Sequence, residues 1–277
     1  MSNSTLRWSK PKLFNDPFDV QFDLHVIADR AAVRAATLDK IWDNYRGEHP
    51  TDSKNLLGRV LQVTRMVNPN LSRQDLESEL AKALDESFKK LHESLPAFHE
   101  KIHQHMSNSE ILCLSEIFDN VQMWAHYAEQ QKGLVLRFRC VPELDSAWGA
   151  AEPVRYTNRM PRLFEQEALS DFLSGRASLS AEELVRKLVY TKADNWSYER
   201  EWRIFGGLSC TPNDYKDIRF QPCELDGVVF GCKMPLTDHE HFAEIIQSIY
   251  PHATVFAATT RSDDFSLIIR EWAGSAP

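Results

Sequence analysis

Apolar residues change their spacing along the chain, and each change predicts a different element. The stretch around residue 130 carries the clearest pattern. An apolar run at 111–115 predicts a strand, and Asp119-Asn120 predict a turn after it. Apolar and aromatic residues then recur at helical spacing over 123–127, and we expect Gly133 to end this helix. Apolar residues alternate with other residues over 134–140, which is the pattern of a second strand.

Residues 29–106 have their apolar positions mainly at helical spacing. Residues 56–63 fit one amphipathic helix, and a capping box at 72–75 opens a longer one. The apolar stripe of the longer helix runs over 76–91. We expect Pro96 to interrupt this helix, because proline lacks an N–H group and its ring clashes with the preceding turn.

The second half of the chain alternates between short strands and helices. A surface helix is predicted at 163–173, and a capping box at 180–183 opens another helix. The remaining elements are a strand at 153–156, a strand at 225–230, a helix at 237–249 and strands at 254–258 and 265–272. The simplest architecture is a single α+β domain over 1–277. It has a mixed, largely antiparallel sheet, flanking helices and a helical insertion at about 29–106.

Composition narrows the class of protein. The chain has 277 residues, 43% of them apolar and 26% charged, which is ordinary for a soluble globular protein. The formal net charge of −8 gives no general attraction for nucleic acid or anionic membranes, although a local basic groove could still bind nucleic acid. The five cysteines show no CxxC spacing, and no apolar run approaches a membrane span. We therefore expect a cytoplasmic protein with reduced thiols and no membrane partner.

Two stretches carry candidate site residues. The first is the short helix bearing Trp124-Ala125-His126-Tyr127 between two strands. The second is 198–205. If it is extended, Glu199, Glu201 and Arg203 share one face. Charged residues in such a row are costly unless they are solvated, paired or functional. The alternative to a site is a Glu–Arg ladder on an exposed face, and the aromatic residues beside it argue against free exposure. These are Trp196, Tyr198 and Trp202.

The segment Phe14–Asp19, with sequence FNDPFD, predicts an ordered turn. One interpretation is structural: Phe14 and Phe18 fill the core, while Asn15 and Asp16 bond their own backbone. The other is that the turn forms the rim of a binding pocket. The two interpretations are compatible.

A literal H-E-x-x-H occurs at 99–103. On a helix it places His99 and His103 one turn apart, where they could share a zinc ion with Glu100 as general base. The sequence points to no third ligand, so a solvated helix face is the favoured interpretation and zinc remains an alternative.

Three motifs in this order resemble a known family. They are FNDPFD at 14–19, CLSE…MWAHYA…GLVLRF at 113–138, and K-x₃-W-x-YE-x-EWRI at 192–204. Together they look like the bacterial domain-of-unknown-function family 2971. The resemblance implies bacterial, cytoplasmic proteins, some of them accessory or effector proteins of phage-defence and toxin-type loci. It also implies a strand before the first motif, and only residues 1–7 precede Trp8 here.

The polar residues of these motifs also resemble the dispersed site of toxin-type ADP-ribosyltransferases, with NAD as substrate. In that hypothesis five residues are catalytic: His126, Tyr127, Glu199, Glu201 and Arg203, the arginine being available for a phosphate. Six more residues are expected to bind substrate, namely Asn15, Asp16, Ser115, Glu116, Trp124 and Trp196. Ser115 is also an alternative to His126.

Two other hypotheses stay open at this point. The same residues could form a non-catalytic sensor that binds a nucleotide or a protein partner from the same locus. The His99 and His103 pair could instead belong to a zinc-dependent hydrolase. The sequence identifies no certain cofactor.

Overall fold

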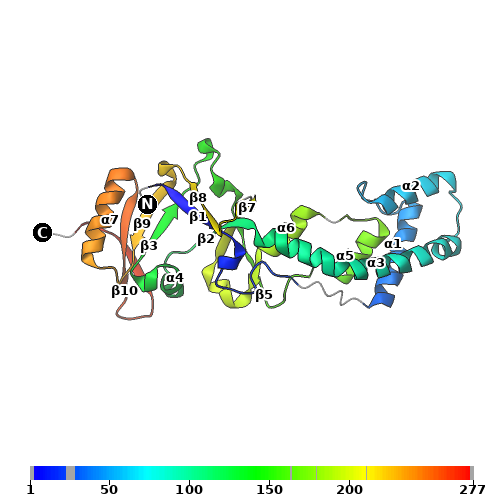
Figure 1. The fold of residues 1–277 in the computed structure, drawn as a ribbon, viewed down its shortest axis with the longest axis horizontal. Coiled ribbons are helices and arrows are strands. Elements are labelled where there is room, and N and C mark those ends of the chain that lie inside the picture. The colour runs from blue at the N-terminus through cyan, green and yellow to red at the C-terminus, as the bar shows by residue number, and fades with distance from the viewer. Residues whose placement is uncertain (1–2, 23–28, 163, 179, 210, 275–277) are drawn as a thin grey trace. The chain divides into compact units, whose positions relative to one another are not determined.

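The structure is a computed structural model, in which the chain divides into two compact units (Figure 1). The described residues are 3–22, 29–162, 164–178, 180–209 and 211–274. Unit 1 comprises residues 1–19, 106–158 and 189–277, and unit 2 comprises residues 20–105 and 159–188. Mostly antiparallel sheets lie in unit 1 and helices make up unit 2, which confirms the α+β class. The helical region expected at 29–106 is joined in unit 2 by a second segment, 159–188.

One sheet of unit 1 has the strand order β11-β10-β9-β3. Strands β9 and β10 are parallel, and the other neighbours are antiparallel. Two helices accompany this sheet, as Figure 1 shows for α7 beside β9 and β10. The bounds are β3 Leu134–Phe138, β9 Leu225–Phe230, β10 Thr254–Thr260, β11 Leu267–Glu271, α4 Val121–Tyr127 and α7 Leu236–Ile249.

The two helices cover opposite faces of this sheet because side chains alternate along each strand. On β9, Val228 and Phe230 pack with Ile246 of α7, whereas Val229 packs with Trp124 of α4. Strand β3 shows the alternation that was expected over 134–140. Its side chains at even positions face α7, and the side chain of Val135 faces α4. The short helix α4 is fixed by an apolar core beneath it.

The second sheet of unit 1 has the order β4-β7-β2-β1-β8, and all its neighbouring strands are antiparallel. A separate parallel pair joins β5 to β6. The bounds are β1 Thr5–Ser9, β2 Ser109–Ser115, β4 Glu152–Pro153, β5 Arg155–Thr157, β6 Thr191–Ala193, β7 Glu201–Leu208 and β8 Tyr215–Arg219. One face buries Trp8, Leu112 and Ile204 as a core. On β2 and β7, the residues that alternate with Leu112 and Ile204 point to the other face, where the candidate site lies.

Unit 2 packs its helices around two apolar cores. One core joins α1, α3 and α5 through Val33, Phe88 and Leu169, and the other joins α1, α2 and α3 around Tyr45 and Leu61. The bounds are α1 Arg30–Arg46, α2 Leu56–Val67, α3 Arg73–Ser107, α5 Gln166–Ser174 and α6 Ala181–Val189, of which α3 and α6 end within unit 1.

Polar contacts and a glycine pair attach the segment 159–188 to the rest of unit 2. Lys40 of α1 is 9% exposed, and its ammonium contacts Glu167 at 2.6 Å and Asp171 at 2.7 Å on α5. A Cβ added to Gly58 of α2 would lie 2.7 Å from the carbonyl oxygen of Gly175. Gly175 has a φ of +87°, a conformation that glycine adopts without steric cost. The close approach of α2 and α5 therefore requires both glycines.

Several expected elements differ from the structure. Pro96 does not interrupt α3, which continues for 35 residues because Leu95 and Ile102 stay buried on either side of the proline. Helix α4 ends at Tyr127, before Gly133, because residues 129–131 all have positive φ. The helix expected at 163–173 is not a surface helix, since Leu169 is fully buried, and residue 163 lies outside the described residues. The strand expected at 153–156 is divided between β4 and β5.

Among the described helices, none is both long and apolar enough to cross a membrane.

His239 on α7 is an unusual buried group. It is 9% exposed, and neither ring nitrogen has a hydrogen-bond partner among the residues that the structure describes. The ring stacks on Phe230 at 4.8 Å between centroids and meets Trp272 edge-on at 6.1 Å. Burial lowers the pKa of His239, and the charge of Asp238 offsets only part of this effect. The folded state therefore favours the neutral ring.

We expect the protein to lose stability below about pH 6.5, the ordinary pKa of histidine, because the unfolded chain binds the proton more readily. The contribution of the neutral His239 is fully present above this pH and is lost as the pH falls towards the lowered pKa. In His239→Phe, the difference in melting temperature between about pH 7.5 and about pH 5.5 should shrink. His241→Phe, at an exposed position of the same helix, is the control and should keep the full difference. Equal differences in the two variants would contradict this account.

Candidate functional site

Unit 1 contains a pocket of about 540 Å³ on the polar face of the second sheet. Strand β2 forms one wall, the end of α4 another, and the turn at 14–19 lies at its rim. The polar side chains that line it are Arg7, Ser9, Asn15, Asp19, Cys113, Ser115, His126, Tyr127, Lys192, Glu199 and Glu201. The pocket thus collects residues from all three family motifs.

The pairing of β2 with β7 brings these residues to one face. Cys113 lies opposite Arg203, and Ser115 lies opposite Glu201, so all four side chains point to the pocket side of the sheet. Glu199 is not on the strand. It ends a helical turn over 194–199, and Arg200, with a φ of 45°, redirects the chain into β7. The Ser115 hydroxyl donates to the carbonyl of Glu199 at 2.7 Å and holds this turn in place. The extended conformation expected for 198–205 is therefore correct only from Glu201.

Arg203 lies directly beneath the pocket and is fully buried. Its Nη1 and Nη2 donate to the two carboxylate oxygens of Asp19 at 2.7 and 2.6 Å. Its Nε and Nη2 donate to Glu201 at 2.7 and 2.9 Å. Nη1 also donates to the carbonyl of Val189 at 2.6 Å. These bonds use all five N–H donors of the guanidinium, so Arg203 has none left for a phosphate.

Lys192 of β6 is the second buried cation. Its ammonium contacts Glu199 at 2.5 Å and Glu201 at 2.8 Å, and it lies 3.7 Å from Asp19. It also lies 5.0 Å from the centre of the Trp196 ring, within range of a cation–π interaction. We call Asp19, Lys192, Glu199, Glu201 and Arg203 the ionic cluster. Its formal charges are three negative and two positive, so its net charge is −1.

The ionic cluster holds Glu201 and Lys192 in fixed protonation states. Burial raises the pKa of Glu201, but the charge and hydrogen bonds of Arg203, and then those of Lys192, outweigh burial and lower it to about 2. Glu201 therefore contributes stability above about pH 4.5 that is lost as the pH falls towards about 2. Burial lowers the pKa of Lys192, but the charge of Glu201 and hydrogen bonds to both glutamates outweigh it and raise the pKa overall. Neither group exchanges its proton near neutral pH.

Two further side chains on the pocket wall keep their protons. Tyr127 is 51% exposed, and its hydroxyl donates to Glu199 at 2.7 Å. Burial of the hydroxyl and then this bond raise the pKa of Tyr127. Cys113 is exposed and lines the pocket. Loss of hydration and then the charge of Glu201 raise the pKa of Cys113, so its thiol stays protonated.

Aromatic rings stand beside the ionic cluster. The His126 ring lies 6.2 Å from Tyr127, 6.4 Å from Trp196 and 6.5 Å from Tyr198, measured between centroids. His126 is exposed and lines the pocket, whereas Trp196 covers Lys192 from behind. The plane of the His126 ring is inclined by 63° to that of Tyr127 and by 58° to that of Trp196, so the rings cluster around His126 without stacking on it.

The structure brings most of the expected site residues together. Arg203 lies below the pocket. Six others line it, namely Asn15, Ser115, His126, Tyr127, Glu199 and Glu201. The Glu–Arg pattern on β7 is buried, so the alternative of an exposed ladder is wrong.

Four expected substrate-binding residues lie elsewhere. Trp124 is 1% exposed, packs in the sheet core and donates its indole N–H to the carbonyl of Phe118. Asp16 is buried and accepts from the backbone N–H of Phe18. Glu116 is exposed and accepts from the indole of Trp202. Trp196 lies behind Lys192 and does not line the pocket.

Sequence reasoning missed Asp19, Lys192 and Cys113, although all three lie within the motifs. Asp19 ends the first motif and Lys192 begins the third, and a charged residue at the edge of a motif is a signal for a partner within it. Cys113 begins the second motif. The turn at 14–19 forms the rim of the pocket and also has a structural role. Phe14 lies over the Arg203 guanidinium, 5.5 Å from the ring centre. Phe18 is 63% exposed, so the expectation that it fills the core is wrong.

The H-E-x-x-H segment forms no metal group. His99 and His103 lie one turn apart on α3 with ring centroids 6.4 Å apart, and His99 packs edge-on against Phe22. In the described part of the chain, no three His, Cys, Asp or Glu residues are placed to hold a metal ion.

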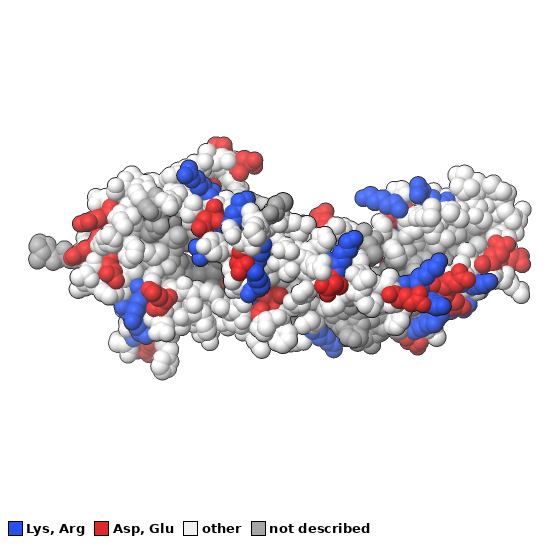
Figure 2. Space-filling model, viewed as in Figure 1, with Lys and Arg blue, Asp and Glu red and all other residues white. Residues whose placement is uncertain are grey.

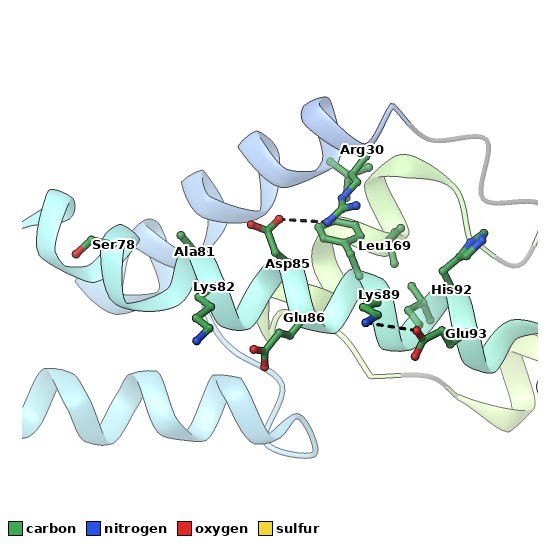
Figure 3. A pocket seen from close by; sticks show the side chains of 13 residues that line it. Arg30, Ser78, Ala81, Lys82, Asp85, Glu86, Lys89, His92, Glu93 and Leu169 are labelled. Atoms are coloured by element: carbon green, nitrogen blue, oxygen red, sulfur yellow. Dashed lines mark hydrogen bonds and ion pairs between the residues drawn. The ribbon is translucent and has the colours of Figure 1, made fainter.

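A larger hollow of about 930 Å³ lies in unit 2 along α3 (Figure 3). Its charged side chains pair with one another, as Arg30 does with Asp85 at 3.4 Å and Lys89 with Glu93 at 3.9 Å. All four side chains are at least half exposed, and such surface pairs contribute little. The pocket of unit 1, with its buried charges, is the stronger candidate for chemistry.

Residues 123–204 match a protein family described as "Protein of unknown function (DUF2971)". The match confirms the resemblance inferred from the motifs. The matched stretch includes α4 from Met123 onward and four of the five members of the ionic cluster, all except Asp19. Comparison with curated proteins and with solved structures gave no match.

Arg203→Met should destabilise the protein strongly, because it leaves Asp19 and Glu201 buried with one cation between them. We expect a loss of about 3–5 kcal/mol in the free energy of unfolding, measured by urea denaturation with tryptophan fluorescence. Arg200→Met is the matched control. Arg200 is 62% exposed in its ion pair with Glu116, so its loss should cost less than about 1 kcal/mol. Similar losses in the two variants would show that the ionic cluster does not stabilise the fold.

Proposed function

We propose that the pocket binds a nucleotide with an N-glycosidic bond, such as NAD, and breaks that bond. The observation that carries this proposal is the net charge of the ionic cluster, in which buried carboxylates outnumber buried cations under the pocket. Cleavage of an N-glycosidic bond passes through a transition state with positive charge on the ribose. Fixed negative charge in a buried site stabilises such a state.

The protonation states of the pocket side chains support this chemistry. When the C1′–N bond of NAD breaks, nicotinamide leaves with both bonding electrons and is neutral, so it needs no proton from the protein. An acceptor, either water or a nucleophilic side chain of another protein, then gives an electron pair to C1′ and loses its proton to solvent. This reaction does not require Lys192, Tyr127 or Cys113 to release a proton, which agrees with the raised pKa of each.

The polar residues of the pocket have separate roles in this proposal. Glu199 is oriented by Tyr127 and Lys192, and its oxygens retain lone pairs for a ribose hydroxyl. The exposed ring of His126 offers a flat surface for a base. Arg203 has no free donor, so we assign the phosphate contact to Arg7, which lines the pocket and whose ion pair with Asp217 is exposed. An effector role in a bacterial defence locus belongs to the proposal and rests on the family resemblance alone.

A non-catalytic sensor is the second candidate, and one observation favours it. Glu201, Lys192 and Arg203 saturate one another with hydrogen bonds and hold fixed charges, which is the property of a rigid recognition site. In this case the pocket would bind a nucleotide without consuming it.

Glu199→Gln tests the two candidates. The substitution keeps the shape of the side chain and removes one negative charge from the ionic cluster, so we expect NAD consumption to fall by about 100-fold or more while NAD affinity changes little. Consumption would be measured by chromatography of released nicotinamide, and affinity by calorimetry. Glu116→Gln removes a carboxylate outside the pocket and should leave both unchanged. Binding without turnover in the wild-type protein would favour the sensor, and neither binding nor turnover would reject both candidates for NAD.

A further inference from the structure

Helix α2 of unit 2 carries apolar side chains on two opposite sides. On the inner side, Leu61 is 2% exposed and packs in the core with Leu57 beside it. On the outer side four apolar residues form a line, which we call the α2 stripe. Their exposed fractions are 68% for Leu56, 48% for Val60, 58% for Val63 and 81% for Val67. Met66, 82% exposed, lies next to the stripe. A contiguous apolar surface of this kind marks an interaction site, whereas single exposed residues do not.

The spacing within the α2 stripe indicates what fits it. The intervals are four, three and four residues, which is the seam that one helix presents to another. The helix has 12 residues and is therefore about 18 Å long. This length corresponds to about three turns of a partner helix laid along it. Polar caps fix both ends of α2, with Asn55 accepting from the N–H of Leu57 at the start, so the stripe lies on a preformed element.

The charges of α2 indicate the chemistry of the partner. The helix has two arginines, Arg59 and Arg65, and no acidic residue. Both arginines are exposed, and neither side chain makes an ion pair or a hydrogen bond with any residue that the structure describes. Arg59 lies beside the α2 stripe, whereas Arg65 follows Leu61 by one turn and lies on the inner side of the helix, against Gly47. Elsewhere in unit 2, Arg46, Arg73 and Arg176 each pair with a carboxylate. The face drawn in Figure 2 shows white and blue surface over α2.

We propose that the α2 stripe is a docking surface for an acidic amphipathic helix of a partner protein. The apolar side chains of that helix would pack on Val60, Val63 and Val67, and a carboxylate at its edge would pair with Arg59. A second copy of this chain is a poorer occupant, because pairing α2 with itself brings arginines together and supplies no carboxylate. The proposal concerns unit 2 and is independent of the pocket in unit 1.

Selection of helical peptides displayed on phage against the full chain tests this proposal without assuming the partner. We expect selected peptides to have apolar residues at intervals of three and four with Asp or Glu beside them. Binding would then be measured with synthetic peptides of the selected sequence. It should weaken at least about tenfold for Val63→Asp and for Arg59→Glu, and should weaken as salt rises.

Leu236→Asp is the matched control, because Leu236 of α7 is 68% exposed and belongs to unit 1. It should bind the peptides like the wild type. A peptide in which the acidic residues are replaced by lysine should bind the Arg59→Glu variant better than the wild type. Agreement of these results would establish both the surface and the sign of its charge.

Three outcomes would overturn the proposal. The first is selection of peptides without acidic bias, or binding that the α2 variants do not change. The second is self-association of the wild-type chain, measured by analytical ultracentrifugation, that Val63→Asp abolishes, because the occupant is then a second copy. The third is slow maleimide labelling of Val63→Cys relative to Leu236→Cys, resolved by peptide mass, because another part of the chain then covers the α2 stripe.

Discussion

The burial of Arg203 is the constraint on which the candidate site depends. A guanidinium taken out of water is costly unless each of its donors finds an acceptor, and here Asp19, Glu201 and Val189 provide all of the acceptors. These acceptors come from the N-terminal turn, from β7 and from the end of α6. One side chain therefore fixes three segments that are far apart in sequence, and Lys192 adds β6 as a fourth.

This constraint also limits the chemistry available. Because the cations are saturated by carboxylates, the pocket offers fixed charges and hydrogen-bond acceptors, and it offers no proton donor from Lys192 or Tyr127 at neutral pH. A reaction that develops positive charge is compatible with such a site, and one that needs a strong general acid from these groups is not. The same rigidity suits selective binding, which is why turnover and affinity have to be measured separately.

The two units differ in the kind of surface they present. Unit 1 carries a concave pocket over buried charges, and unit 2 carries an exposed apolar helix face with Arg59 beside it. Small polar ligands are recognised by the first kind of surface and protein partners by the second. Chemistry and partner recognition can therefore be separated by substitutions in different units.

The sequence by itself determined the α+β class, most elements and the three motifs that meet at the pocket, because spacing and turn residues act locally. It could not determine that Pro96 lies within a continuous helix, since burial of Leu95 and Ile102 on either side is a tertiary effect. Trp124 and Glu199 lie in the same kind of motif, yet only packing made the first a core residue and the second a pocket residue. Likewise, the sequence predicted that Arg203 binds a phosphate. The fold instead places Asp19, 184 positions away in the sequence, against its guanidinium. Whether a charged side chain is free depends on which distant partner the fold supplies.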